Sequence, residues 1–196
     1  MVEDRSAPDP SGVAPGMLLV AAPGLLDPNF RRTVVYIVEH RGQGSLGVVL
    51  NHPSEVTVAD VLPRWAPLSS GPPVVFVGGP VESETALCLA TLRTGRTADG
   101  VDGLVPIRGP VALVDLDGDP DALAPHLRGM RVFAGYAGWD SRQLAGEIQR
   151  GDWIVVPALP DDVVAGQGPE LWPRVLRRQG MPVALLATFP ADVKHN

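Results

Sequence analysis

The side chains best suited to chemistry lie close together in the stretch FAGYAGWDSRQLAGEIQRGDW, residues 133–153. This stretch places Tyr136 and Trp139 shortly before Gln143 and Glu147. A carboxylate can carry a proton in acid–base catalysis, and aromatic rings beside it suit a ligand cleft. We therefore expect Tyr136 and Trp139 to flank a cleft rather than lie wholly inside the core, with Glu147 facing that cleft. A purely structural corner is the alternative.

The structural alternative rests on helix capping in SRQLAGEIQ, which follows Asp140. Asp140 is a suitable N-cap, and Gln143 three residues later can reach back to the Asp140 N–H, which would complete a capping box. Leu144 and Ile148 are four residues apart and predict a buried stripe on one face of the helix. Gly138, just before the helix, would let the strand bend tightly. Capping alone is enough to explain Gln143.

A second set of candidate residues lies outside this stretch. The turn at Gly78-Gly79 can present backbone N–H groups as a nest for an anion, and Arg31 or Arg32 can pair with the charge of that anion. Either Glu147 or His40 would then be the proton carrier. If the fold gathers these groups around one cleft, an enzyme that acts on a small anionic substrate is favoured.

Other motifs have simple structural explanations. His40 and His52 flank a predicted hairpin and could approach the same edge, so a spatial Ser/His/Asp arrangement stays open, although the sequence has no G-x-S-x-G motif. GQGSLG at 42–47 leads into a strand, which indicates a hairpin turn and not a nucleotide loop. DLDGDPD at 115–121 lacks the Gly and Glu that an EF-hand needs at positions six and twelve. Cys88 has apolar neighbours and is expected to be inert.

The elements that must position these residues are short and frequently interrupted. Strands are predicted at 16–23, 33–40, 45–51, 72–80, 105–116, 130–138 and 152–158. Helices are predicted at 57–62, 119–127, 141–149 and 170–179. Residues 84–92 fit either strand or helix, and 181–189 form a last apolar segment. The two strands at 33–40 and 45–51 form the clearest hairpin.

Composition narrows the classes of protein that fit. The 196 residues are 45% hydrophobic and suffice for one domain, with 22 Gly and 21 Pro that predict many tight turns. Residues 1–15 show no apolar pattern and are expected to be a disordered tail before a domain at 16–196. One cysteine excludes an intrachain disulfide, and no apolar run approaches the length of a membrane helix. A cytoplasmic location is the expectation.

The charge balance argues against a nucleic-acid surface. The formal net charge is −6 and the isoelectric point is about 5.1, whereas nucleic-acid binding normally needs a basic face. Arg174, Arg177 and Arg178 could form one cationic face on the last helix, although such surface arginines are commonly just solvated. We therefore expect strong nonspecific nucleic-acid binding to be absent.

Four segments together resemble the AlgH-like family, a bacterial family named after a proposed regulator of alginate synthesis. They are DPNFRRTVVYIVEHRGQGSLGVVLNHP at 27–53, VGGPV at 77–81, FAGYAGWDSRQLAGEI at 133–148 and ELWPRVLRRQG at 170–180. The resemblance implies one α+β domain in which a bent, mixed β-sheet forms a small barrel-like core wrapped by helices. It implies no particular activity. The residues that match and that we group as a candidate binding cleft are Asp27, Arg31, Arg32, His40, Asn51, Gly78, Gly79, Tyr136, Trp139, Gln143 and Glu147.

Two departures from the family pattern weaken an acid–base role at the positions concerned. Ala90 stands where many relatives have a His, and Asp140-Ser141-Arg142-Gln143-Leu144-Ala145 replaces a common G-P-G-Q-L-E. The first hypothesis is therefore a non-catalytic binding or regulatory protein, with no catalytic residue, no metal and no cofactor assigned. The alternatives are the enzyme that acts on a small anionic substrate near Trp139 and the Gly78-Gly79 turn, and a protein-interaction module. A small anionic ligand or a protein partner fits these hypotheses, and a membrane does not.

Overall fold

One long strand, β9 (Leu127–Asp140), organises the sheet of this protein. On one side β9 pairs antiparallel with β6 (Val81–Leu92). On its other side it pairs antiparallel with β3 (Gly44–Val49) near its end, and in parallel with β5 (Val74–Val77) further back. The computed structural model describes residues 11–164 and 168–191.

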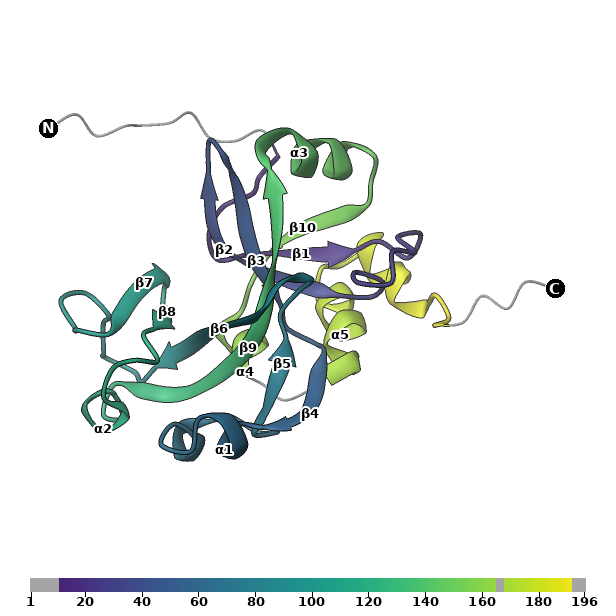
Figure 1. The fold of residues 1–196 in the computed structure, drawn as a ribbon. Helices are drawn as coiled ribbons and strands as arrows, with labels where there is room; N and C mark the ends of the chain where they lie inside the picture. Colours follow the sequence, from purple (N-terminus) through teal and green to yellow (C-terminus); the bar gives the residue numbers. More distant parts are fainter. Residues whose placement is uncertain (1–10, 165–167, 192–196) are drawn as a thin grey trace, which may run out of the picture.

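The remaining strands extend this framework in both directions (Figure 1). The order along the main path is β10-β1-β2-β3-β9-β6-β8-β7, and β4 is attached through β5. These strands are β1 (Met17–Ala21), β2 (Val34–Arg41), β4 (Pro53–Thr57), β7 (Leu104–Arg108), β8 (Val111–Val114) and β10 (Trp153–Pro157). The β5–β9 pair is the one parallel pairing among the named strands of the described residues.

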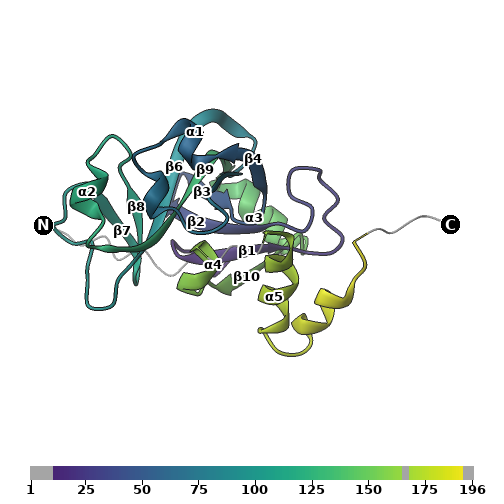
Figure 2. The ribbon, with the colours of Figure 1, turned by 90° about the horizontal axis from the view of Figure 1, so that it is seen from below.

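Helices are short and fill the ends and one side of the curled sheet. Figure 2 shows α5 (Leu171–Arg177) beside β1 and β10, and α5 contributes Trp172 and Leu176 to the core that also contains β1 and β2 residues. The other helices are α1 (Val58–Val61), α2 (Pro120–Leu123), α3 (Ser141–Gln149) and α4 (Pro160–Val164). Three 3-10 turns lie at Ala66–Leu68, Gly168–Glu170 and Val183–Thr188.

Alternation of side chains along the strands divides the interior into separate hydrophobic clusters. Even-numbered β2 residues such as Tyr36 join the largest cluster with Phe76, Phe133 and Trp172. Odd-numbered residues such as Val35 lie on the other face of the sheet, in a cluster with Trp139. The same strands therefore present two chemically different faces, which decides where a site can form.

The predicted fold class is confirmed: one α+β domain is built on a curled, mixed sheet with helices packed against it. Thr57 and Asp119 cap α1 and α2, since each side chain accepts a hydrogen bond from a backbone N–H of its helix. The ambiguous segment 84–92 is strand, within β6. The last apolar segment contains a 3-10 turn and forms no strand.

Three expectations about boundaries need correction. The hairpin turn is confined to Gly42 and Gln43, because β3 already begins at Gly44. Strand β9 continues through Gly138 to Asp140, so the chain makes no bend at this glycine. The predicted tail at 1–15 extends too far: residues 1–10 lie outside the described residues, but Val13 is buried in the cluster that contains Trp139. A single apolar residue gives no periodic pattern, so Val13 could not be recognised from the sequence.

Candidate functional site

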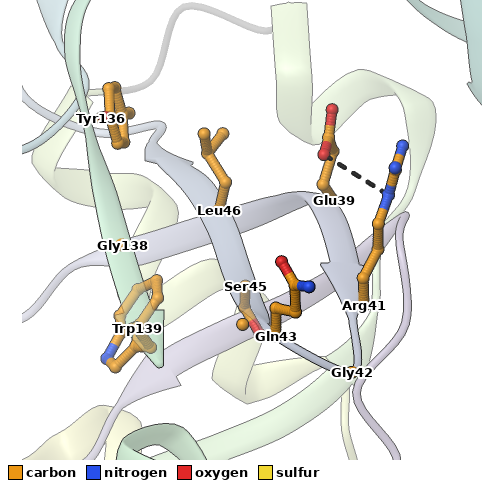
Figure 3. Close-up of a pocket in the computed structure, with 10 residues that line it drawn as sticks. Glu39, Arg41, Gly42, Gln43, Ser45, Leu46, Tyr136, Gly138 and Trp139 are labelled. Atoms are coloured by element: carbon orange, nitrogen blue, oxygen red, sulfur yellow. Dashed lines mark ion pairs between the residues drawn. The ribbon is translucent and has the colours of Figure 1, made fainter. Parts of the chain in front are cut away.

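A concave surface with several polar side chains lies at the end of the β2–β3 hairpin, against β9 (Figure 3). Its volume is about 630 Å³, within the range that small-molecule sites occupy. We call it the hairpin pocket, and the residues that line it are Glu39, Arg41, Gly42, Gln43, Gly44, Ser45, Leu46, Tyr136, Gly138 and Trp139.

A β-bulge sets the chemistry of this pocket. The pairing of β2 with β3 shifts between Ile37 and Glu39, after which Glu39 lies opposite Leu46 and Arg41 opposite Gly44. An inserted residue in one strand reverses which side chains point to each face. Before the bulge, the hydrophobic side chains of Val34 and Tyr36 occupy this face of the sheet and join the largest cluster. After the bulge, the same face carries the charged side chains of Glu39 and Arg41.

The charges in the hairpin pocket are opposite in sign and accessible. Arg41 Nε lies 3.7 Å from Glu39 Oε2, and the two side chains are 80% and 56% exposed, respectively. An ion pair this exposed contributes little to stability, because water screens it. Figure 3 shows Leu46 between this pair and the ring of Tyr136. The pocket thus combines a cation, an anion, an amide from Gln43 and an apolar wall.

Trp139 does not share this face. It lies opposite Ser45 on β3, whereas Gly138 lies opposite Leu46, so the Trp139 side chain points to the other side of the sheet. There it is buried against Phe30 and Trp153, with ring centroids 5.8 Å from each. Two residues three positions apart on a strand point in opposite directions. Both residues line the hairpin pocket, but the Trp139 ring is 5% exposed and packs in the core, so the expectation that Trp139 lies outside the core was wrong.

Glu147 holds the two buried indoles together. Its Oε2 accepts hydrogen bonds from Trp139 Nε1 at 2.9 Å and from Trp153 Nε1 at 2.8 Å. We call Trp139, Trp153 and Glu147 the indole network. Glu147 is half-buried and does not line the hairpin pocket, so the expectation that it faces a cleft beside Tyr136 is not met. A carboxylate that already accepts two indole N–H groups stabilises the corner between α3, β9 and β10.

The capping box is only half present. Asp140 caps α3 as predicted, with its Oδ1 accepting from the backbone N–H groups of Arg142 and Gln143. The Gln143 side chain, however, points along the helix, where its Nε2 donates to Glu147 Oε1 at 3.0 Å. Residues four apart on a helix are neighbours, and the Glu147 carboxylate is a stronger acceptor than a neutral group. Gln143 therefore orients Glu147 and does not complete the cap.

The Gly78-Gly79 turn is a close backbone crossing. The Gly78 N–H donates to Ala134 O at 2.8 Å and its carbonyl accepts from Val49 N at 2.8 Å. A Cβ at Gly78 would lie 2.3 Å from Gly135 O, and one at Gly79 would lie 2.2 Å from the Tyr136 carbonyl. Because the Gly78 N–H is already bonded, the predicted anion nest lacks one of its donors. These glycines let β5 run directly against β9.

The connection before β2 is anchored by interactions of its own. Arg32 Nη1 donates to Phe189 O at 2.9 Å, and its guanidinium carbon lies 4.0 Å from the centroid of the Trp172 ring. Arg31 is exposed, and Asp27 Oδ1 accepts from Asn29 N in a local turn. This connection meets the glycine turn at a separate hollow of about 130 Å³ lined by residues that include Asn29 and Gly79. Tyr136 is not among the residues that line this hollow, and neither arginine lines the hairpin pocket.

Asn51 is a structural residue. It is buried, its Oδ1 accepts from Val34 N at 2.9 Å, and its Nδ2 donates to Arg32 O at 2.9 Å. The amide thus satisfies one backbone donor and one backbone acceptor where β2 begins. Asn51 therefore holds the start of β2 against Leu50 and its neighbours, and it is not among the residues that line the hairpin pocket.

The two histidines lie at opposite ends of the hairpin, because its strands are antiparallel. His40 lies near the turn, with Nδ1 2.7 Å from Ser45 Oγ. His52 follows β3 at the open end and lines the small hollow beside Gly79. Burial lowers the pKa of His52. The expectation that both histidines approach one edge was wrong, while the His40–Ser45 pair was not anticipated.

A buried carboxylate pairs with two of the three arginines of the predicted cationic face on α5. Asp162 on α4 is buried, and both of its oxygens accept hydrogen bonds from Arg178, at 2.7 and 2.6 Å. Arg174 adds a third contact to the same carboxylate at 3.5 Å. Only Arg177 of the three is exposed. Asp162 is 12 positions from Arg174 and 16 from Arg178 in the sequence, so the sequence gave no signal of this pairing.

Cys88, metal binding and membrane insertion are the remaining possibilities raised by the sequence. Cys88 is fully buried, and burial raises the pKa of its thiol, which makes the reactive thiolate scarce. Within residues 11–164 and 168–191, no group of three or more His, Cys, Asp or Glu side chains could hold a metal ion. None of the helices in the described ranges has the length and apolar character needed to span a membrane.

The structure thus places Tyr136 and Trp139 along the hairpin pocket, while hydrogen bonds join the Trp139 ring and Gln143 to Glu147 in the corner behind it. The pocket residues that sequence reasoning missed are Glu39, Arg41, Gln43 and Leu46. The local pattern offered one signal: V-E-H-R places two opposite charges two positions apart at the end of a strand, hence on one face. The bulge that decides which face has no signature in the sequence.

The sequence model described as AlgH-like matches residues 18–184. UPF0301 proteins from Rhodococcus jostii and Mycolicibacterium smegmatis are each 57% identical over 194 residues, covering 99% of this chain and 96% of theirs. A crystal structure of a protein from Corynebacterium diphtheriae has a TM-score of 0.87 at 41% identity, over 90% of this chain and 93% of that one. The solution structure of the AlgH protein from Pseudomonas aeruginosa has a TM-score of 0.65 at 28% identity, over 96% and 98%.

Proposed function

The chain belongs to the AlgH-like family, and from this premise we propose that it is a non-catalytic binding protein whose ligand occupies the hairpin pocket. The observation that carries the proposal is the exposed Glu39–Arg41 pair on a concave surface of about 630 Å³. Stability does not account for this arrangement, since so exposed a pair contributes about 0–1 kcal/mol. Both charges can be re-paired by a ligand at little cost.

The chemistry of the lining defines the class of ligand. Arg41 suits a carboxylate, Glu39 suits an ammonium group, and Gln43 offers both a donor and an acceptor. Leu46 and Tyr136 form an apolar and aromatic wall for the rest of the molecule. A small zwitterion with an apolar side chain, such as an amino acid or a dipeptide, fits this combination better than a purely anionic molecule.

A thermal-shift screen of the purified chain against the L-amino acids and a set of dipeptides tests this proposal. A ligand present at 100 times its Kd adds ~2.7 kcal/mol of stability, which for a chain of this size raises Tm by about 5–10 °C. We expect at least one zwitterion to do so for the wild type and to lose the effect with Arg41→Gln. The screen contradicts the proposal if no compound stabilises the protein, or if Arg41→Gln responds like the wild type.

A hydrolytic enzyme is the second candidate, and one observation favours it. His40 Nδ1 lies 2.7 Å from Ser45 Oγ, the separation of a nucleophile and its general base. Against it, Ser45 is only 8% exposed, although it lines the hairpin pocket. Hydrolysis of p-nitrophenyl acetate that disappears with Ser45→Ala would favour the enzyme. Equal background rates for the two proteins favour the binding protein.

A further inference from the structure

A second concave surface is lined by residues of β4, β5, β6 and β9, and it shares no residue with the hairpin pocket, although β9 contributes to both. Its volume is about 570 Å³, and its apolar lining includes Val56, Val61, Leu62, Val75, Val77 and Val132. We call it the valine groove. Figure 1 shows the elements that line it, which are α1, β4, β5, β6 and β9.

The groove exposes aliphatic side chains that folding alone would bury. Val56, Val61 and Val77 are 46%, 52% and 45% exposed, and they come from three different elements: β4, α1 and β5. Single exposed apolar residues are ordinary on protein surfaces, but a contiguous set in a hollow indicates an interaction site. The groove therefore needs an apolar occupant.

The wall of the groove also includes the edge of a sheet. In the described part of the chain, β4 pairs with β5 alone, so its outer edge has no neighbouring strand. An extended peptide can add to such an edge through main-chain hydrogen bonds while its alternate side chains enter adjacent pockets. Val56 of β4 points into the groove, so a strand added there would place every second side chain beside it.

The charged residues around the groove indicate which charge a bound partner should carry. Of the described residues that line the groove, Glu84 is the one with a charged side chain. It belongs to a bulge in β6, where pairing with β9 is interrupted between Val81 and Ala86, and Glu82 in the same bulge is also exposed. The cation that follows α1, Arg64, is paired with Asp119 at 2.7 Å. The groove is thus apolar with an acidic rim.

We propose that the valine groove docks an extended segment of a partner protein, one with aliphatic side chains at alternate positions and flanking Lys or Arg residues. The apolar side chains fill the groove, the backbone pairs with the edge of β4, and the basic residues meet Glu82 and Glu84. This inference concerns surface residues that the hairpin pocket does not share, so it stands or falls separately from the proposed ligand.

Fluorescence anisotropy with two synthetic peptides tests the proposal on the full chain. One probe alternates valine and threonine and ends in lysines, and the other replaces those lysines with glutamates. We expect the basic probe to bind at least about tenfold more tightly than the acidic one, and Glu84→Lys to reverse that preference. Equal binding of the two probes, or no measurable binding of the basic probe, would overturn the proposal.

Variants in the groove provide the second arm. Val77→Asp and Val61→Asp replace exposed valines and should each weaken the basic probe by at least about tenfold, because both put a charge on the apolar surface. The matched control is Leu26→Asp, an exposed leucine outside the groove, which should change binding by less than about twofold. Unchanged binding by both groove variants overturns the proposal. A wild-type dimer in sedimentation that Val77→Asp converts to a monomer also overturns it, since the occupant is then a second copy.

Discussion

The two faces of the β2–β3–β9 end of the sheet carry opposite kinds of residue, although they are built from the same strands. On one face, Trp139 is buried and its indole N–H is satisfied by Glu147. On the other face, Glu39 and Arg41 are exposed and pair only loosely with each other. Polar groups that complete their hydrogen bonds inside the protein hold the fold together. Polar groups left accessible in a hollow are the ones available to a ligand.

The close crossing behind this end of the sheet should give the largest effect. Gly79→Ala places a Cβ about 2.2 Å from the Tyr136 carbonyl, which must move β5 away from β9. We expect a loss of at least ~3 kcal/mol in the free energy of unfolding from urea titrations. Gly138→Ala is the matched control on the pocket face, where the nearest atom, in the Tyr136 ring, is 3.7 Å away. A similar loss for both variants would mean that the two glycines have the same structural role.

The indole network should give the next largest effect. Glu147→Leu removes the acceptor of two indole N–H groups that have no other partner in the described contacts. We expect a loss of about 2–4 kcal/mol, because each buried donor left without a partner costs about 1–3 kcal/mol. Glu147→Gln keeps one oxygen and should lose less.

Gln143→Ala is the control for this network, and it should cost at most ~0.5 kcal/mol, because Gln143 is exposed and does not serve as a cap. This ranking reverses what the sequence alone suggests, where Gln143 would be the structural residue. A larger loss with Gln143→Ala than with Glu147→Leu in urea titrations would contradict the network.

Asn51 is a candidate site residue from the family resemblance, and the structure shows it bonded to the backbone inside the protein. Asn51→Ala leaves Val34 N and Arg32 O without their partner in a buried position. We expect a loss of about 1–3 kcal/mol in urea and no change in ligand response in the thermal-shift screen. A variant with wild-type stability but altered ligand response would return Asn51 to the site.

The smallest effect on stability should come from the pocket face itself. Arg41→Gln removes one partner of an exposed ion pair and should change the free energy of unfolding by less than ~0.5 kcal/mol. Its effect should appear in ligand binding instead. A stability loss comparable to that of Glu147→Leu would show that Arg41 supports the fold.

The contrast between the faces explains what the sequence could predict. Asp140 and the helix after it follow from local capping chemistry, and both are found as expected. Period-2 alternation would have separated Tyr136 from Trp139 once β9 was known to reach Asp140. The bulge after Ile37 depends on how β2 pairs with β3, and the sequence of one strand alone does not determine that pairing. The pocket charges were missed for this reason.

The same reasoning applies to the long-range partners. Glu147 and Trp153 are six residues apart, yet they meet only because β10 returns alongside α3. Asp162 on α4 accepts hydrogen bonds from Arg178 at the end of α5, and this pairing removes the predicted cationic face. In both cases residue type was informative, but the pairing required the tertiary structure.

A titration of the isotope-labelled protein, followed in a two-dimensional ¹H–¹⁵N correlation spectrum, tests the division between the two faces most directly. The ligand is the amino acid or dipeptide that gives the largest thermal shift. We predict that the largest changes affect the backbone amides of residues 39–46 and of Tyr136 and Gly138, while the indole N–H signals of Trp139 and Trp153 move least. Large shifts of those two indole signals with unchanged hairpin amides would place the ligand at the indole network and contradict the account.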